Sequence, residues 1–453
     1  MSARIPPLVA PLVSDEAKRI LDLVAKFVEE DCMPADAVLE AQLGFGDDRW
    51  EAEPSIVEEL KSKARRLGLW NMFLPKGFYA ESGGWSNVEY GLMAEWLGRS
   101  RSAAEACNCS APDTGNMEVL AKYGSKAQKE KWLKPLLDGT TRSAFLMTEP
   151  GVASSDATNI QLTMRREGDE YVLNGDKWWS SGAGDARCSL YLVVGRSNPE
   201  AKDAHRKQSL VLVPADTKGI TIQRMLNVYG YDDAPHGHGH LTFTNVRVPV
   251  ANLVLGEGRG FEILQGRLGP GRIHHAMRSI GACEVALEWM LMRINDASKK
   301  PFGKLLREHG VMMEWIARSR IEIDAARLVV LNAAARMDSS GGAKPALSDI
   351  AAAKVLAPST ALQVIDRAVQ ALGAAGVSQD SPLANMWANI RTLRIADGPD
   401  EVHLQQLGKA ENKRAGERAT RRITEQKRKT EELLARFGLR RAEPGTRISR
   451  AKM

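Results

Sequence analysis

The chain has 453 residues, of which 43% are hydrophobic and 26% charged, as in a globular protein with room for about three domains. No apolar run approaches the roughly 20 residues that cross a bilayer, and the N-terminus lacks a secretory signal pattern, so we expect a cytoplasmic protein. The five scattered cysteines favour reduced thiols over a disulfide framework or a zinc site.

The net charge of +6 is concentrated at the C-terminus. Residues 412–453 carry 14 Lys and Arg against 5 Asp and Glu, a net of +9, so the other residues sum to −3. A basic tail of this kind can bind nucleic acid, a membrane surface or an acidic partner. A solvated helix with a frayed end is the simpler interpretation and the one that we favour.

Two changes of hydrophobic periodicity divide the chain into three parts. A helical spacing of three and four runs from Asp15 to about Arg142. It gives way to strand-like alternation between about 144 and 250, where several short runs predict a small barrel or sandwich. The first run ends in Asn174-Gly175, which predicts a hairpin turn. The alternating residues are Tyr171 and Leu173, then Leu190, Leu192 and Val194, then Leu210 and Leu212, and finally Leu241 and Phe243.

Helical spacing returns after Pro249. Residues 312–330 keep one apolar face over about five turns, and Ala-rich stretches at 350–355 and 361–371 indicate close-packed helices of a bundle. The sequence therefore predicts an α+β chain in the order helices (1–143), β domain (144–251), helical bundle (252–411) and basic tail (412–453).

Two stretches in the first half of the chain carry side chains suited to ligand binding. The stretch 145–156, with Gly151 and several hydroxyls, can present hydrogen-bond donors to a polar ring edge or a phosphate. Trp178 and Trp179 are adjacent, so on a strand they face opposite sides, and one can pack in the core while the other flanks a flat ligand. A turn-rich loop and plain core packing are the structural alternatives.

A third stretch, residues 266–275, opens the helical region. Gly269-Pro270-Gly271 predicts a turn at the start of a helix, with Arg272 in the first turn. A cation there opposes the helix dipole, so Arg272 is either paired with an anion or solvated. His274 and His275 can be no more than surface residues.

A fourth stretch, residues 394–403, contains three carboxylates around a Gly-Pro pair. A carboxylate before Gly398-Pro399 sits where a helical pattern breaks, which can hold it rigidly at the mouth of a cavity. An acidic turn that ends a helix is the alternative. Spacing alone does not choose among Asp397, Asp400 and Glu401.

Taken together and in this order, the four stretches resemble the acyl-CoA dehydrogenase family from about Asp15 to Glu411, and in particular its branch of family members ten and eleven. In that branch Thr-Glu-Pro is followed by Ala-Ser-Ser-Asp, Trp-Trp-Ser-Ser-Gly recurs, and the late loop reads Ala-Asp-Gly-Pro-Asp-Glu-Val-His. The resemblance implies an N-terminal helical domain, a middle β-barrel and a C-terminal four-helix bundle. It also implies FAD as cofactor and an acyl-CoA thioester as substrate.

The resemblance assigns a role to each matching residue. Asp397, where most relatives have Glu, would remove the α proton while the β carbon delivers hydride to flavin N5, leaving a trans-2-enoyl-CoA. Arg272 and Ser155 would lie near the substrate. Residues implied to contact FAD are Phe145, Met147, Thr148, Gly151, Ser154, Ser155, Trp179, Ser181, Lys299, Phe302, Gln370, Leu372 and Gly373.

The family also implies partners. Gln370, Leu372 and Gly373 fall where members reach the FAD diphosphate from a neighbouring subunit, which implies a homodimer or homotetramer, and an electron-transfer flavoprotein would accept the electrons. Three positions depart from the family pattern. Lys299 stands for Arg, Ala374 for the second Gly, and Pro399 for Thr.

Alternative functions remain open on the same fold. One branch of the family binds DNA through a basic C-terminal region, with which the +9 tail invites comparison. Another alternative is a flavin oxidase or monooxygenase. His236, His238 and His240 stand at every second position, so on a strand they would share one face, as metal ligands can. We favour a turn or loop without metal. The acyl chain, including any 4-hydroxy or 4-phosphoryl substituent, is not specified.

Overall fold

The computed structural model describes residues 5–74 and 84–441, the side chains of 268–270 excepted. It divides the chain into two units, Met1–His403 and Leu404–Met453. The first unit contains the helices and the sheet that the periodicity predicts. Within the described ranges, no helix is long and apolar enough to cross a membrane.

The N-terminal part of the first unit is helical, as predicted. In α1 (Asp15–Phe27) the apolar residues Ile20, Val24 and Phe27 are buried, because spacings of three and four place them on one face. The side chain of Ser14 caps α1 and donates to Glu89 of α4, 2.7 Å away. The other helices are α2 (Met33–Leu43), α3 (Ser55–Leu67), α4 (Asn87–Leu97), α5 (Ala103–Ala106), α6 (Asp113–Tyr123), α7 (Lys126–Gln128) and α8 (Lys134–Leu137).

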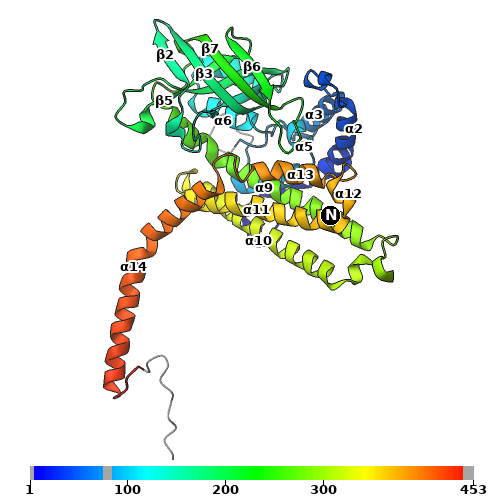
Figure 1. Cartoon of the computed structure of the whole chain (residues 1–453), viewed down its shortest axis with the longest axis vertical. Coiled ribbons are helices and arrows are strands. Elements are labelled where there is room, and N and C mark those ends of the chain that lie inside the picture. The colour runs from blue at the N-terminus through cyan, green and yellow to red at the C-terminus, as the bar shows by residue number, and fades with distance from the viewer. Residues whose placement is uncertain (1–4, 75–83, 442–453) are drawn as a thin grey trace, which may run out of the picture. The chain divides into compact units, whose positions relative to one another are not determined.

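The middle part forms one seven-stranded sheet in the order β1-β4-β2-β3-β7-β6, with β5 paired to β4. Figure 1 shows β2, β3, β7 and β6 side by side. The predicted strand runs all lie in strands. The bounds are β1 (Arg142–Leu146), β2 (Thr163–Glu167), β3 (Glu170–Ser181), β4 (Cys188–Arg196), β5 (Gln208–Pro214), β6 (Ile220–Met225) and β7 (His238–Pro249).

The predicted hairpin at Asn174-Gly175 is wrong. Strand β3 continues through it, and Gly175, at φ 142°, marks a shift in the register with β7 between Leu173 and Gly175. Pairing with β2 on one side and β7 on the other keeps the backbone extended, so tertiary pairing overrides the local turn preference. The glycine supplies a bulge instead of a turn.

The C-terminal part of the first unit is a bundle around α9 (Gly260–Asn295), which Figure 1 shows beside α10 (Gly310–Ser340) and α11 (Leu347–Leu372). Two short helices follow, α12 (Ala374–Val377) and α13 (Leu383–Thr392). The backbones of α4 and α9 touch, since a Cβ added to Gly281 would lie 1.9 Å from the Glu95 carbonyl oxygen. Glycine is required at this crossing because no side chain fits.

The predicted helix start at Gly269-Pro270-Gly271 is also wrong. Helix α9 begins at Gly260 and continues through this segment. Ile263 before it and Ile273 after it are both buried, so core packing on both sides keeps the segment helical despite the hydrogen bond that proline removes. Arg272 therefore lies in the interior of a long helix.

The second unit begins within α14 (Asp400–Arg436). From Leu404 onward the helix is mainly exposed and carries ion pairs along its own surface, among them Arg414 with Glu411 at 2.6 Å and Arg428 with Glu425 at 2.5 Å. Such pairs are typical of a solvated helix. Residues 442–453 of the predicted basic tail lie outside the described residues.

Candidate active site

Asp397 lies in the loop between α13 and α14 with its main chain clamped. Its φ is 57°, an uncommon value for a residue other than glycine. The carbonyl oxygen accepts hydrogen bonds from Arg272 Nε at 3.2 Å and Nη2 at 3.0 Å, and lies 3.2 Å from His403 Nε2. Arg272 thus donates hydrogen bonds to the backbone carbonyl of the predicted base. The sequence did not predict this contact.

The Asp397 carboxyl is surrounded by cationic and titratable groups. Its Oδ2 lies 3.9 Å from His275 Nε2, and about a quarter of the side chain is exposed. Burial acts to raise the pKa of this carboxyl, but the charges of His275, Arg267, Arg272 and Lys354 outweigh burial and hold the pKa below its ordinary value. Burial lowers the pKa of His275 to about 4, so at neutral pH the lasting cations are the arginines and the lysine. Asp397 is therefore ionised.

Asp400 and Glu401, the other two acidic residues of this stretch, have different surroundings. The Asp400 side chain is buried and accepts a 2.6 Å hydrogen bond from Arg394 Nε. Lys354 Nζ donates to the Gly398 carbonyl at 2.6 Å and lies 3.9 Å from Asp400 Oδ1. Glu401 is exposed. Of the three acidic residues, Asp397 therefore differs from the other two in having its main chain held by Arg272.

A buried ion pair between Lys177 and Glu149 holds the loop after β1, residues 147–156, in place. Lys177 Nζ donates to the Met147 carbonyl at 2.8 Å and to Glu149 Oε1 at 2.7 Å. Glu149 also accepts the backbone N–H groups of Gln161 and Leu162, each at 2.8 Å. Burial lowers the pKa of Lys177 to about 8 although Glu149 opposes that shift.

This loop and the end of β3 meet, so the structure brings together the predicted residues of both stretches. The Trp178 N–H donates to the Thr148 carbonyl at 3.0 Å. Trp179 is 41% exposed. Ser154 and Ser155 lie in the same loop as Gly151, at which an added Cβ would meet nothing within 4 Å. An exposed aromatic face thus adjoins a loop that carries hydroxyl groups.

We expected Trp178 and Trp179 to face opposite sides of β3, but the strand is irregular at this point. Trp179 has φ 50°, and the register with β7 shifts between Lys177 and Ser180. This bulge breaks the two-residue alternation, and the indole centroids lie 6.4 Å apart. Among the described residues, the buried Trp178 Nε1 has no hydrogen-bond partner.

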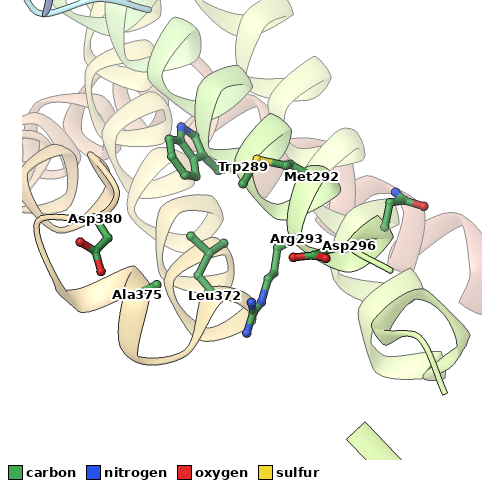
Figure 2. Close-up of a pocket in the computed structure, with 8 residues that line it drawn as sticks. Trp289, Met292, Arg293, Asp296, Leu372, Ala375 and Asp380 are labelled. Atoms are coloured by element: carbon green, nitrogen blue, oxygen red, sulfur yellow. The ribbon is translucent and has the colours of Figure 1, made fainter. Parts of the chain in front are cut away.

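The remaining predicted cofactor residues form a second group, at the C-terminal ends of α9 and α11. A pocket of about 530 Å³ lies there, lined by Leu372 together with Trp289, Met292, Arg293, Asn295, Asp296, Ala375 and Asp380 (Figure 2). Gln370 lies in the last turn of α11, which ends at Leu372, and Gly373 follows with a φ of 67°. Lys299 is exposed, and Phe302 is 95% exposed. In the described part of the chain, no hydrogen bond or salt bridge joins this group to the β1–β3 group.

Sequence reasoning missed a buried acid near the site. Glu118 of α6 is 3% exposed, and neither carboxyl oxygen has a hydrogen-bond partner among the described residues. Burial raises its pKa to about 8, although Arg267 and Lys122 oppose the shift. The Arg267 guanidinium lies 4.0 Å from the centroid of the Phe145 ring. A lone Glu within a helical pattern carries no signal of burial, so its environment could not be foreseen.

An ionic network between the N-terminal helices and the sheet was also missed. His236 lies between two carboxylates, with Nε2 2.9 Å from Glu105 Oε2 and Nδ1 2.7 Å from Asp185 Oδ2. Arg142 contacts Glu105 at 2.9 Å and Asp113 at 2.7 Å. Burial acts to lower the pKa of His236, but the two carboxylates raise it above its ordinary value. Within the described ranges, no group of three or more His, Cys, Asp or Glu could hold a metal ion.

Comparison with known proteins identifies the family to which this architecture belongs. Three domain families match along the chain, the N-terminal domain of acyl-CoA dehydrogenase at 14–140, its middle domain at 144–246 and its C-terminal domain at 258–411. The chain is 54% identical to FadE2 of Mycobacterium tuberculosis, over 79% of this chain and 86% of that protein. It is 48% identical to human acyl-CoA dehydrogenase family member 11, over 90% of this chain.

The chain spans about half the length of the curated relatives from the branch of members 10 and 11, for example 52% of the human protein. A solved structure from Mycobacterium abscessus, assigned to the acyl-CoA dehydrogenases, is 48% identical and covers 89% of this chain and 99% of its own with a TM-score of 0.85. Butyryl-CoA dehydrogenase of Megasphaera elsdenii is 28% identical, covers 88% and 98%, and has a TM-score of 0.73. The chain therefore belongs to the acyl-CoA dehydrogenase family, on the branch of family members 10 and 11.

Proposed function

We propose that the chain is an FAD-dependent acyl-CoA dehydrogenase, in which Asp397 removes the α proton of an acyl-CoA thioester. The observation that carries the proposal is the setting of Asp397. Its main chain is clamped by Arg272, its carboxyl is ionised, and the cations of α9 and α11 surround it. A base must be deprotonated and rigidly placed to take a proton from carbon.

The polar groups at the β1–β3 junction fit a flavin. The exposed Trp179 indole offers a flat face, Ser181 and the residues of the 147–156 loop supply hydroxyl and backbone groups, and the unpartnered Trp178 Nε1 is a spare donor. Phe145, Met147, Thr148, Gly151, Ser154 and Ser155 would complete this site. Bound FAD would supply the hydride acceptor for the β carbon.

Asp397 contributes two groups to the reaction that we propose. Its carboxylate accepts the α proton. Among the described residues its backbone N–H donates to no other group, so it is available to the thioester carbonyl oxygen, where negative charge grows as the proton leaves. The positive charges of Arg267, Arg272 and Lys354 would stabilise the negative charge on the thioester oxygen, although they also make Asp397 a weaker base. Exclusion of water by the bound substrate would restore its basicity.

The second group of predicted residues would serve a second copy of the chain. Gln370, Leu372, Gly373, Lys299 and Phe302 lie apart from the β1–β3 group, with the Phe302 side chain almost wholly exposed. They would reach the diphosphate end of FAD in a neighbouring subunit, in a homodimer or homotetramer. An electron-transfer flavoprotein would then reoxidise the enzyme.

An anaerobic titration of the purified protein with a panel of acyl-CoA thioesters tests the proposal. The panel spans chain length and includes 4-hydroxyacyl and 4-phosphorylated acyl thioesters. We expect a yellow protein whose flavin absorbance is bleached by one class of thioester. A colourless protein would refute the cofactor assignment. Rapid peroxide formation in air would instead favour an oxidase, and salt-sensitive DNA binding lost on removal of 412–453 would favour the DNA-binding alternative.

A further inference from the structure

Helix α14 carries an uncharged seam along its exposed part. Of the 22 residues in 412–433, 12 are charged, yet one series of positions, spaced alternately by four and three residues, contains no charged side chain. This spacing is the heptad repeat of helices that pack side by side. The α14 seam consists of Asn412, Gly416, Ala419, Ile423, Gln426, Thr430 and Leu433.

The α14 seam is open to solvent. Ile423 is 45% exposed and Leu433 is 52% exposed, and the other seam residues are exposed or half-buried. Large apolar side chains at heptad positions are the ones that a neighbouring helix buries when it packs on such a seam. The seam therefore has the spacing of a helix-packing face and is uncovered.

Basic residues border the seam on both sides. With Ile423 at heptad position a and Gln426 at position d, the flanking positions are e and g. Within 412–436 every charged residue at these positions is basic. The residues are Lys413 and Lys427 at e, and Arg422, Lys429 and Arg436 at g.

The acidic residues of this part of α14 lie away from the seam. All of them occupy heptad positions b or c, namely Glu411, Glu417, Glu425, Glu431 and Glu432. Glu425 pairs at 2.5 Å with Arg428, which is at position f on the far face. Among the described residues, Lys413, Arg422 and Lys427 pair with no carboxylate. The cations beside the seam are therefore available to a partner.

We propose that the α14 seam docks an acidic amphipathic helix of another protein, with Glu or Asp beside the two rows of Lys and Arg. A second copy of α14 does not have the required charge. In a parallel pair position g faces e of the partner helix, so Arg422 would face a second Lys427. In an antiparallel pair e faces e and g faces g, which again brings cations together.

Other anionic partners match the flanking charges but not the seam. DNA phosphates bind Lys and Arg but leave Ile423 and Leu433 in water. A lipid surface would take up these two side chains together with Asn412, Gln426 and Thr430, whose polar groups are costly to bury in an apolar medium. Paired helices tolerate a polar residue in the seam, where it fixes the register. An acidic helix therefore fits both the seam and its borders.

The probe is a synthetic peptide of four heptads with Leu at a and d, one Asn at d, and Glu at e and g. Its binding to the full chain is measured by fluorescence anisotropy of the labelled peptide at low and at physiological salt. We expect binding that weakens as the salt concentration rises, because charge pairs border the contact. A peptide of the same composition with its Leu residues moved off the seam should not bind.

Two pairs of neighbouring substitutions test the seam and its borders. Ile423→Glu should weaken peptide binding about tenfold, the effect of losing one buried apolar side chain, whereas Thr424→Glu, at position b, should keep the wild-type affinity. Arg422→Glu should weaken binding about threefold, as the loss of a solvent-exposed charge pair does. Arg421→Glu, at position f, is its control and should bind as wild type does.

Absence of peptide binding at low salt would overturn the inference, as would equal weakening by Ile423→Glu and Thr424→Glu. Retention on duplex DNA or phosphatidylserine vesicles at a salt concentration that abolishes peptide binding would assign the face to phosphate or lipid instead. A lower oligomeric state of Ile423→Glu in sedimentation would assign it to a second copy. The proposed function fails separately, since a colourless protein can still bind the peptide.

Discussion

The buried pair of Lys177 and Glu149 should determine whether the predicted cofactor loop is formed at all. The lysine side chain is fully buried and the carboxylate is 6% exposed. Lys177→Met removes the ammonium and its two hydrogen bonds, to Met147 and to Glu149. Glu149 keeps the N–H groups of Gln161 and Leu162 but becomes a buried carboxylate without a counter-charge.

Breaking one side of a buried ion pair costs about 3–5 kcal/mol of stability. Because two backbone donors still solvate the carboxylate, we expect the lower end, about 3 kcal/mol. Adding Glu149→Gln to Lys177→Met removes the unpaired charge and should recover part of that loss, although the amide has one acceptor oxygen and keeps only one of the two backbone N–H bonds. The free energy of unfolding from urea denaturation measures both effects, and the dissociation constant of FAD should rise with the loss of loop order.

Lys134→Met is the matched control, since Lys134 pairs with Glu130 on the surface at 3.4 Å, with both side chains mostly exposed. It should leave stability and FAD affinity unchanged. A Lys177→Met protein within about 1 kcal/mol of wild type would refute the reasoning, because a cost so small is that of a solvated pair. The same conclusion would follow if the double variant were less stable than Lys177→Met.

Three further predictions concern other charged or titratable groups. Arg272→Met should lower the rate of flavin reduction by roughly a hundredfold, as displacement of a reacting group by about 1 Å does, and an unchanged rate would show that the clamp on Asp397 is dispensable. The pKa of His236 is raised above 6.5, so its stabilisation is complete below pH 6.5 and is lost as the pH rises through the folded value. Urea unfolding should therefore find His236→Gln more costly at pH 6 than at pH 9, and an equal cost at both would contradict this. Glu118 has its pKa raised from 4.5 to about 8, so between these values the folded state binds the extra proton and stability falls as pH rises. Glu118→Gln avoids that loss and should gain up to about 3 kcal/mol at pH 7, with a gain that disappears near pH 4; a pH-independent difference from wild type would count against the assignment.

Periodicity predicted the elements whose buried faces are regular. Helices α1 and α10 and the strands of the sheet follow from spacings of three and four or of two, because one face of each element packs against the core. The two turn predictions failed where long-range packing opposes local preference. Asn174-Gly175 lies inside a strand paired on both sides, and Gly269-Pro270-Gly271 lies inside a helix with buried residues on both sides.

The spacing of residues in the sequence could not distinguish Asp397 from the acidic residues near it. Asp397 and Asp400 look alike in the sequence, and they differ through Arg272, 125 positions away, and Lys354. The same holds for Glu118 and for His236, whose surroundings depend on elements far along the chain. Family resemblance named Asp397 because it supplies the tertiary arrangement that a single sequence lacks, and the hydrogen bonds from Arg272 to its carbonyl support the proposal that it is the base.

Rapid-mixing kinetics of flavin reduction under anaerobic conditions, in Asp397→Asn beside wild type, test the central claim most directly. The amide keeps the shape of the side chain but cannot take a proton, and Glu401→Gln is the control from the same loop and helix start, since Glu401 is exposed. We predict a rate of reduction by acyl-CoA about 10²–10⁴ times lower in Asp397→Asn, with product binding retained and Glu401→Gln at the wild-type rate. Reduction at the wild-type rate in Asp397→Asn would contradict the assignment of Asp397 as the base.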